Sequence, residues 1–390
     1  MKVIVIGSGV LGASITYQLA KRGADVTVIE KDVPGDAASA ASFAWLNSND
    51  KSDPPAYHHL NAMSIAEWNL IARELGTSGW LHREGNLHVV DTTPEAEALA
   101  SLVEQAHSLG YAAVPVMLHE LTRLDPVVRI RPEYEYAVFF PEEGHITVPL
   151  LIHDLLSAAV SFGAEVRHTT SVSDLIREGD HIRGVILDNG ERLESDVTVL
   201  AAGAGIGSLL GKQGVDAKTE GTPGITVTTS PGTSNVSTML HLPGLSVRPD
   251  TSGRIVVRSS VSDQHIDLQS WTLPHEAVQR LFEQTAEGLT DVDPNTVRAE
   301  RVQIAYRPYP LDGLPVIGAW DGLPGLYVTT MHSGVTLGAI TGRLVAEEIT
   351  TNDPSPLLEE FRPSRLIEAT ARGDAHFDPY ALERERQPLA

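Results

Sequence analysis

The first thirty residues constrain the fold most, because they carry the pattern of a strand, a glycine turn, a helix and a second strand. An apolar run at 3–6 leads into Gly7-Ser8-Gly9-Val10-Leu11-Gly12, and a second apolar run at 26–29 ends at Glu30. A turn of this kind brings backbone close to a pyrophosphate, and the helix that follows it presents a positive dipole end to the phosphates. The pattern predicts a Rossmann-type α/β domain that binds an ADP-containing dinucleotide.

Each position of this motif has its own role. Gly7 allows the tight turn, Gly9 admits the pyrophosphate without a Cβ, and Gly12 lets the helix pack on the strand. Glu30 is placed to accept hydrogen bonds from the adenosine ribose hydroxyls. A phosphate-free strand–turn–helix is one alternative. A secretory signal is another, which the glycines, Gln18 and the lack of a small-residue cleavage pattern disfavour, so we expect a cytoplasmic protein.

Composition excludes several classes of function. The 390 residues suffice for two domains, and the net charge of −22 disfavours nucleic acid and anionic membranes as partners. No apolar stretch is long enough to span a membrane. The absence of cysteine excludes disulfides, thiolate zinc sites and a cysteinyl bond to a cofactor. His58-His59 is the one adjacent histidine pair, and we expect it in a Pro-rich loop, so no metal site is predicted.

The rest of the chain alternates between two kinds of segment. A helix is expected over 150–162, a buried strand ending in a glycine loop over 196–205, antiparallel sheet over 219–262, and a late strand and helix over 325–349. We therefore predict an α/β protein in which a Rossmann-type dinucleotide-binding domain is interleaved with an antiparallel-sheet α+β substrate domain. The predicted boundaries are 1–50, 148–218 and 310–350 for the first domain, 51–147 and 219–309 for the second, and 351–390 for a C-terminal extension.

Five motifs occur in an order that is typical of one enzyme family. They are the glycine turn with its Glu30, the small-residue segment 35–42, the Leu-Ala-Ala-Gly-Ala-Gly run at 200–205, the RPxxxDGLPVIG run at 307–318, and His332-Ser333-Gly334 between a strand and a helix. From residue 1 to about 350 the chain resembles the FAD-dependent D-amino acid oxidase superfamily, in particular its glycine oxidase, sarcosine oxidase and D-amino acid dehydrogenase branches.

The resemblance implies FAD rather than NAD, and oxidation of a small amino acid or N-substituted amino acid at its C–N bond by hydride transfer to the flavin. Reduced flavin would pass its electrons to O₂ or to another acceptor. Some relatives carry a flavin-linked cysteine where this chain has Ala305, so the implied FAD is non-covalent. The sequence gives no prediction of the oligomeric state.

The resemblance also implies which residues bind the cofactor. The backbone of Val172 would face the adenine, and the N–H groups of 334–336 would face the pyrimidine edge of the flavin. The predicted cofactor-binding residues are Gly7, Gly9, Val10, Leu11, Gly12, Glu30, Lys31, Ala38, Ser39, Ser42, Val172, Ala202, Gly203, His332, Gly334, Val335 and Thr336.

Substrate recognition is assigned first to Arg307, because its guanidinium can bind a carboxylate with two parallel charge-assisted hydrogen bonds. A structural ion pair with a nearby acid is the alternative for this arginine. Arg258 replaces a glycine that is common in relatives, and it is either a second anion anchor or a solvated side chain. Trp45 completes the predicted substrate-binding residues.

Two histidines join Arg307 as predicted catalytic residues. His332 precedes the late helix, and His265 stands where sarcosine oxidases carry a lysine over the flavin, although it could be a surface residue. An alternative function with the same fold is a 2-hydroxy acid dehydrogenase, in which His332 or His265 would take the hydroxyl proton. A weakly active flavin-binding subunit is the remaining alternative.

Overall fold

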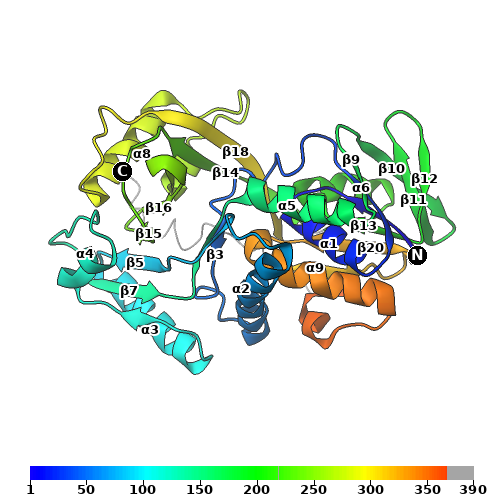
Figure 1. Ribbon diagram of the computed structural model, residues 1–390, viewed down its shortest axis with the longest axis horizontal. Coiled ribbons are helices and arrows are strands. Elements are labelled where there is room, and N and C mark those ends of the chain that lie inside the picture. The colour runs from blue at the N-terminus through cyan, green and yellow to red at the C-terminus, as the bar shows by residue number, and fades with distance from the viewer. Residues whose placement is uncertain (218, 367–390) are drawn as a thin grey trace.

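The structure is a computed structural model that describes residues 1–217 and 219–366, and it has two lobes (Figure 1). The predicted extension 351–390 therefore lies largely outside the described residues. We call the lobes the Rossmann lobe, which holds β1 and α1, and the eight-stranded lobe, which holds the largest sheet.

The Rossmann lobe is built on a six-stranded sheet with the order β19-β20-β13-β1-β2-β9. All neighbouring strands are parallel except the pair β19 and β20. The strands are β1 (Lys2–Ile6), β2 (Asp25–Ile29), β9 (Glu165–Arg167), β13 (Val197–Leu200), β19 (Val316–Ala319) and β20 (Leu326–Thr330). Three separate parts of the sequence thus meet in one sheet.

Both faces of this sheet are covered. Val3 and Val5 of β1 share a core with helices on one face, whereas Ile4 and Ile6 face a second core. The helices of the first face are α1 (Val10–Lys21), α2 (Pro55–Leu75), α5 (Val148–Ser161) and α9 (Gly334–Thr351). The second face is covered by α6 (Ile206–Lys212) and by a small sheet of β10 (Val172–Glu178), β11 (His181–Leu187) and β12 (Arg192–Glu194).

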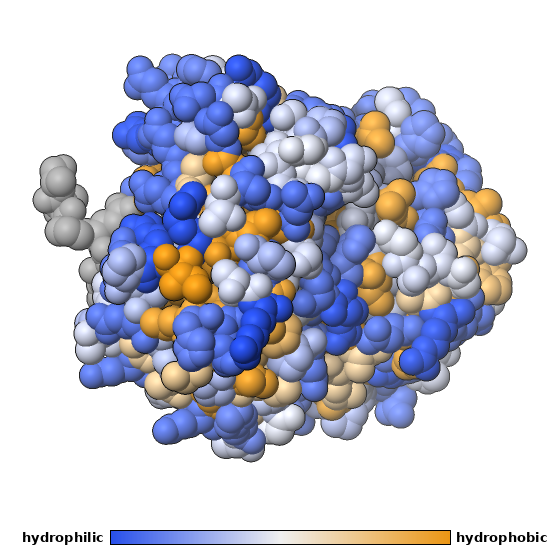
Figure 2. All heavy atoms as spheres, turned by 60° about the vertical axis from the view of Figure 1, so that its left-hand side comes forward, coloured by the Kyte–Doolittle hydropathy of each residue, from blue (hydrophilic) through white to orange (hydrophobic). Residues whose placement is uncertain are grey.

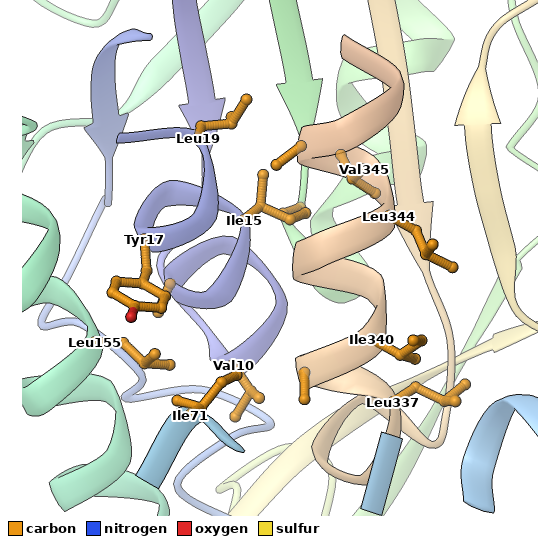
Figure 3. Packing of buried hydrophobic residues seen from close by; sticks show 14 of the residues in the cluster. Val10, Ile15, Tyr17, Leu19, Ile71, Leu155, Leu337, Ile340, Leu344 and Val345 are labelled. Carbon is orange, nitrogen blue, oxygen red and sulfur yellow. The ribbon is translucent and has the colours of Figure 1, made fainter. Parts of the chain in front are cut away.

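Helix α1 packs between α5 and α9 (Figure 3). Ile15 points from α1 toward α9, while Leu155 of α5 lies beside the other side of α1. Gly342 makes the close contact with α9 possible, since a Cβ at this position would lie 2.9 Å from the backbone and Cβ of Ser14. The close packing fixes the relative positions of the two helices whose N-termini face the candidate site.

The eight-stranded lobe contains one large sheet with the order β18-β14-β17-β16-β15-β5-β7-β6, antiparallel except for the pair β15 and β5. Its strands are β5 (Asn86–Val90), β6 (Val114–Pro115), β7 (Tyr136–Phe140), β14 (Thr219–Thr229), β15 (Met239–Leu242), β16 (Leu245–Pro249), β17 (Ile255–Arg258) and β18 (Ala299–Pro310). Its helices are α3 (Thr93–Ser108), η1 (Leu118–Glu120), α4 (Leu121–Leu124), η3 (Thr251–Gly253), α7 (Ser260–Gln264) and α8 (His275–Gly288). Figure 2 shows hydrophilic residues over most of the surface seen from this side, with a group of hydrophobic residues among them.

Two features connect the lobes. Strands β14 and β18 pair along their length, from Thr219 opposite Pro310 to Thr229 opposite Ala299, and both contact η2 (Gly203–Gly205) of the Rossmann lobe. This ribbon runs from one lobe to the other (Figure 1). A small sheet of β3 (Trp45–Leu46), β8 (Gly144–Ile146) and β4 (Leu81–His82) forms the second connection. The last described element is η4 (Pro356–Phe361).

The predicted fold class is confirmed, since a parallel Rossmann-type sheet and an antiparallel sheet are interleaved along the chain. The domain boundaries remain a prediction, and we note that α2, within 51–147, packs on α9 of the Rossmann lobe. The loop expected at His58-His59 is wrong, because both residues lie in α2, which begins at Pro55. Proline is tolerated in the first turn of a helix, where its missing N–H would have no helical partner anyway.

No helix in the described part of the chain is both long and apolar enough to cross a membrane. Within the same residues, no three His, Cys, Asp or Glu side chains gather in a way that could hold a metal ion.

Candidate active site

The glycine turn after β1 has no room for side chains. Gly7 has a φ of +95°, and a Cβ on this residue would lie 2.6 Å from the carbonyl oxygen of Ala201. A Cβ on Gly9 would lie 2.9 Å from the Oγ of Ser39. The turn is thus enclosed by the small-residue segment 35–42 and by the end of β13. Bare backbone between two such walls fits the pyrophosphate of a dinucleotide.

The N-terminus of α1 is held by two side chains from other segments. The N–H of Val10 donates to the Oγ of Ser39 at 3.1 Å. The carboxylate of Glu30 accepts the N–H of Ser8 at 2.8 Å and its hydroxyl at 3.0 Å. Glu30 is therefore fixed beside the turn, at the end of the strand where a ribose would lie. Its predicted bond to that ribose remains a prediction.

A second helix N-terminus lies close to the first. The hydrogen bonds of α9 begin with the N–H of Leu337, which donates to the carbonyl of Ser333 at 3.0 Å. The N–H groups of 334–336 consequently have no partner within the helix. A Cβ on Gly334 would lie 3.6 Å from the side chain of Leu11, so this helix start faces the beginning of α1. Three N–H groups and a positive dipole end fit the electron-rich edge of a flavin.

Tyr57 of α2 supports this helix start. Its hydroxyl donates to the Oγ of Ser333 at 2.8 Å, and burial raises the pKa of the Tyr57 hydroxyl above its usual range. The phenol therefore stays protonated and donates to the residue that precedes α9.

The other predicted cofactor residues lie around these turns, and all of them except the buried Gly12 and Thr336 are exposed or partly buried. Lys31 is exposed and pairs with Asp32 at 3.5 Å. The Oγ of Ser42 accepts the N–H of Ala44 at 2.9 Å. Ala38 lies in the small-residue segment, Val172 begins β10, and Ala202 and Gly203 follow β13. Leu11 and Gly12 lie in the first turn of α1. Val335 and Thr336 lie in the first turn of α9.

Two arginines share one buried carboxylate in the eight-stranded lobe. The Nη2 of Arg307 lies 3.1 Å and the Nη2 of Arg258 lies 3.5 Å from the same Oδ2 of Asp263. The Asp263 side chain is only 2% exposed, and its other oxygen accepts the N–H of Ile225 at 2.8 Å. Arg307 also donates to the carbonyl of Pro223 at 2.8 Å. The ion pair considered for Arg307 thus exists, yet the three side chains together keep a positive charge.

His332 lies next to these cations. Its ring stacks on Tyr309 with 4.3 Å between ring centroids. Desolvation by the surrounding protein lowers the pKa of His332 well below its usual value, helped by the charges of Arg307, Lys51 and Arg258, although the residue keeps exposed surface. We therefore take His332 as a solvent-accessible member of the candidate site, with a neutral imidazole.

Lys51 is a buried cation that no sequence pattern singles out. Its ammonium donates to the Oδ1 of Asn47 and pairs with Asp50 at 3.0 Å, and it lies 5.8 Å from the centroid of the Trp45 ring. The segment 47–51 is buried except for Asp50. A polar run of this length that becomes buried indicates function, but the sequence gives no sign of its burial.

Trp45 packs on His241, and His241 and Arg258 both stand opposite Ser246 of β16, on its two neighbouring strands. The ring of Trp45 lies 4.1 Å from the ring of His241, measured between centroids. Burial, followed by the charges of His88 and Arg258, lowers the pKa of His241 well below its usual value. Arg258 therefore lies close enough to His241 to act on it, which connects Trp45 with the cation cluster.

His265 is placed differently from the other predicted catalytic residues. It is exposed and follows the last residue of α7, where its N–H donates to the carbonyl of Ser262 at 3.1 Å. The structure thus brings Arg307, Arg258, His332 and Trp45 together, whereas His265 lies at the protein surface.

Comparison with known proteins gives one consistent result. The model of a family described as FAD-dependent oxidoreductase matches residues 2–348. Glycine oxidase of Geobacillus kaustophilus (strain HTA426) is 26% identical over 377 residues, which cover 94% of this chain and 97% of that protein. D-amino acid dehydrogenase of Rhizobium rhizogenes is 24% identical over 416 residues, with 89% of this chain and 95% of that protein covered.

Solved structures show the same fold. The crystal structure of glycine oxidase from Geobacillus kaustophilus has a TM-score of 0.82 at 23% identity, with 93% of this chain and 98% of that chain covered. L-proline dehydrogenase from P. horikoshii has a TM-score of 0.84 at 21% identity, with 96% and 99% covered.

Proposed function

This chain belongs to the family of FAD-dependent oxidoreductases, and from that premise we propose that it oxidises the C–N bond of a small amino acid or N-substituted amino acid to an imine. FAD is its cofactor, and when bound it supplies the acceptor for the hydride that leaves the carbon next to nitrogen. The observation that carries the proposal is the pair of arginines on Asp263.

The carboxylate of the substrate would bind at these arginines. Asp263 offsets one of the two positive charges and fixes the guanidinium groups, because its other oxygen is held by the backbone of Ile225. Arg307 and Arg258 remain partly accessible, with side chains 21% and 24% exposed. A fixed and partly desolvated guanidinium suits a carboxylate better than a free surface arginine does, because less side-chain entropy is lost on binding.

The same positive charge selects the neutral form of the substrate amine. An ammonium beside His332 would be repelled by Arg307, Arg258 and Lys51, whose charges act on that site. A neutral amine needs no side chain to remove its proton before the hydride leaves. An anionic carboxylate at one end and a neutral amine at the other therefore match the charges of the candidate site.

The alternative 2-hydroxy acid dehydrogenase fits less well. It requires a base for the hydroxyl proton, and the lowered pKa of His332 makes its imidazole a weak one. His265, the other candidate base, is exposed at the end of α7. Both observations favour the amine over the alcohol.

We assign FAD to the two facing helix starts. The backbone at Gly9 and Val10 would hold the pyrophosphate, Glu30 the ribose, and the N–H groups of 334–336 the pyrimidine edge of the flavin. Ala305 stands where a cysteinyl tether would be, and the chain has no cysteine, so FAD would be released intact on denaturation.

An anaerobic bleaching screen tests the proposed reaction. The purified yellow protein is mixed with amines, amino acids, N-substituted amino acids and 2-hydroxy acids, and the flavin absorbance is followed. Bleaching by amino acids, but not by the matching amines without a carboxylate, is expected. Bleaching by hydroxy acids alone would establish the alternative, and no bleaching by any of them would contradict both.

A further inference from the structure

Glu143 is a completely buried carboxyl group between the two lobes. It lies in the turn after β7, and the next residue, Gly144, begins β8. A Cβ on Gly144 would lie 2.0 Å from the carbonyl oxygen of His82, so the turn is pressed against β4. This contact determines where the Glu143 side chain enters the interior.

Four donors from four segments converge on this carboxyl group. Its Oε2 accepts the indole N–H of Trp45 at 2.9 Å, the amide of Asn49 at 3.1 Å and the amide of Asn86 at 3.0 Å. Its Oε1 accepts the hydroxyl of Tyr111 at 3.1 Å. Such a group connects β3, the following polar segment, β5 and the segment after α3.

Trp45 belongs to a ring of four side chains, each of which contacts the next. Glu143 binds the indole N–H, His241 lies against the indole ring, and the Nδ1 of His241 lies 2.7 Å from the Oδ1 of Asn86. Asn86 in turn donates to Glu143. Since each member of this ring of side chains is held by two others, the orientation of the indole depends on the carboxyl group.

The other side of the same segment is attached to α9. The Oγ1 of Thr336 donates a hydrogen bond to the carbonyl of Trp45 at 3.0 Å. The same Oγ1 accepts a hydrogen bond from the N–H of Asn47 at 3.3 Å. The chain at 45–47 is therefore held by Glu143 through a side chain and by α9 through its backbone.

We propose that Glu143 is a positioning residue of the active site, which fixes the indole of Trp45 as a wall against the bound substrate. It touches neither substrate nor flavin, and it acts through Trp45. The substrate side of this inference rests on the proposed function. The orientation of Trp45 can be measured independently of it.

The effect of substitutions follows from the hydrogen bonds. Glu143→Ala leaves the N–H and O–H groups of Trp45, Asn49, Asn86 and Tyr111 without their acceptor in the interior. Glu143→Gln keeps one carbonyl oxygen for the three nitrogen donors, and its amide can donate to the Tyr111 hydroxyl. Positioning by hydrogen bonds therefore predicts rescue by glutamine.

The experiment uses the FAD-loaded protein with Glu143→Ala, Glu143→Gln, Trp45→Phe and the double variant Glu143→Ala/Trp45→Phe. Glu142→Ala is the matched control, because the neighbouring Glu142 is exposed. We expect Glu143→Ala to raise KM about tenfold with a smaller change in kcat, and Glu143→Gln to stay within about threefold of the wild type. The double variant should be no worse than either single variant, since both remove the same contact.

A second measurement reports on the indole itself. With 5-fluorotryptophan incorporated, the ¹⁹F resonance of Trp45, assigned by its loss in Trp45→Phe, should shift or broaden in Glu143→Ala and stay in place in Glu142→Ala. An unchanged resonance in Glu143→Ala, or full additivity of the two KM effects, would overturn the proposal. So would a Glu143→Gln variant as impaired as Glu143→Ala.

If Glu143→Ala does not fold, Trp45→Phe and Glu143→Gln still test the proposal. Trp45→Phe removes the hydrogen bond between the indole and Glu143 by deleting its donor. A KM unaffected by Trp45→Phe would overturn the proposal. Failure of the proposed function is distinct from this result: in that case no amino acid bleaches the flavin, while the ¹⁹F comparison still reports on Glu143.

Discussion

The Oγ1 atom of Thr336 donates a 3.0 Å hydrogen bond to the carbonyl oxygen of Trp45, which joins the first turn of α9 to β3. The Oγ1 atom of Thr336 also accepts a hydrogen bond from the N–H of Asn47. One hydroxyl group therefore links the helix start that we assign to the flavin with the strand that we assign to the substrate wall. Cofactor binding and substrate binding should depend on it together.

Thr336→Val should test this link, because valine has a similar shape and lacks the hydroxyl. Losing two hydrogen bonds of a buried group is expected to lower the free energy of unfolding by about 1–3 kcal/mol. FAD affinity and KM should both worsen, as measured by flavin release and steady-state kinetics. A variant with weaker FAD binding and an unchanged KM would show that the two sites are independent.

Gly9→Val should give a colourless protein, since its side chain would meet Ser39 at the place assigned to the pyrophosphate. The wild type should release intact FAD into the supernatant on acid precipitation, as measured by its absorbance and chromatography. Flavin that stays with the precipitate would contradict non-covalent binding.

Arg307→Ala should lower kcat/KM about 100-fold, equivalent to about 3 kcal/mol of transition-state binding. Arg307→Lys should recover only part of this, because the planar fork is lost. Asp263 keeps Arg258 as a partner in both variants, so the flavin spectrum should change little. Unaltered kinetics in Arg307→Ala would move the anchor to Arg258, and Arg258→Ala would then carry the loss.

Reoxidation of the reduced enzyme by O₂ should depend on a positive charge near the flavin, which stabilises the developing superoxide. If His265 supplies it, the rate is modest, increases in His265→Lys and falls in His265→Ala. If the buried Lys51 supplies it, the rate falls in Lys51→Met.

Stopped-flow reoxidation of these variants distinguishes the two residues. Lys212→Met is a suitable control, because Lys212 is exposed and binds the carbonyl of Ser173 in the Rossmann lobe. A rate that is unchanged in the His265 and Lys51 variants would remove both residues from this step.

The ionisation of Glu143 should lower the free energy of unfolding as pH rises. Burial raises the pKa of Glu143 to about 8, with Asp50 adding to the shift and Lys51 opposing it. An acid whose folded pKa lies above its unfolded value contributes stability below the unfolded pKa, and this contribution is lost as pH rises through the folded pKa. Glu143→Gln cannot ionise, so between about pH 5 and pH 8 its stability relative to the wild type should improve by up to about 1.4 kcal/mol per pH unit. Urea unfolding of both proteins at several pH values measures this, and a difference that does not vary with pH would contradict it.

The sequence predicts the parts of the fold that depend on neighbouring residues. The turn at Gly7 and the helix starts at Val10 and Gly334 follow from local glycine placement and apolar spacing, and the fold class follows from their order. The helix at His58 does not follow in this way, because the prolines at 54 and 55 indicate a loop, although they begin the helix.

The side chains that complete the candidate site could not be predicted in the same way. Glu143 and Trp45 are 98 positions apart, and Lys51 is buried only when α2 and the two lobes enclose its segment. Asp263 lies two positions before His265. The resemblance to sarcosine oxidases over this short segment therefore pointed to the segment that contains Asp263, but it singled out the exposed His265. Burial of polar groups is produced by tertiary contacts, which local patterns do not report.

The paired ribbon of β14 and β18 has a mechanical consequence. A single-strand linker can bend at a few φ/ψ angles, but this ribbon can bend sharply only by breaking the hydrogen bonds between its strands. It therefore holds the two lobes in a fixed arrangement. We expect turnover to proceed without the lobes swinging apart.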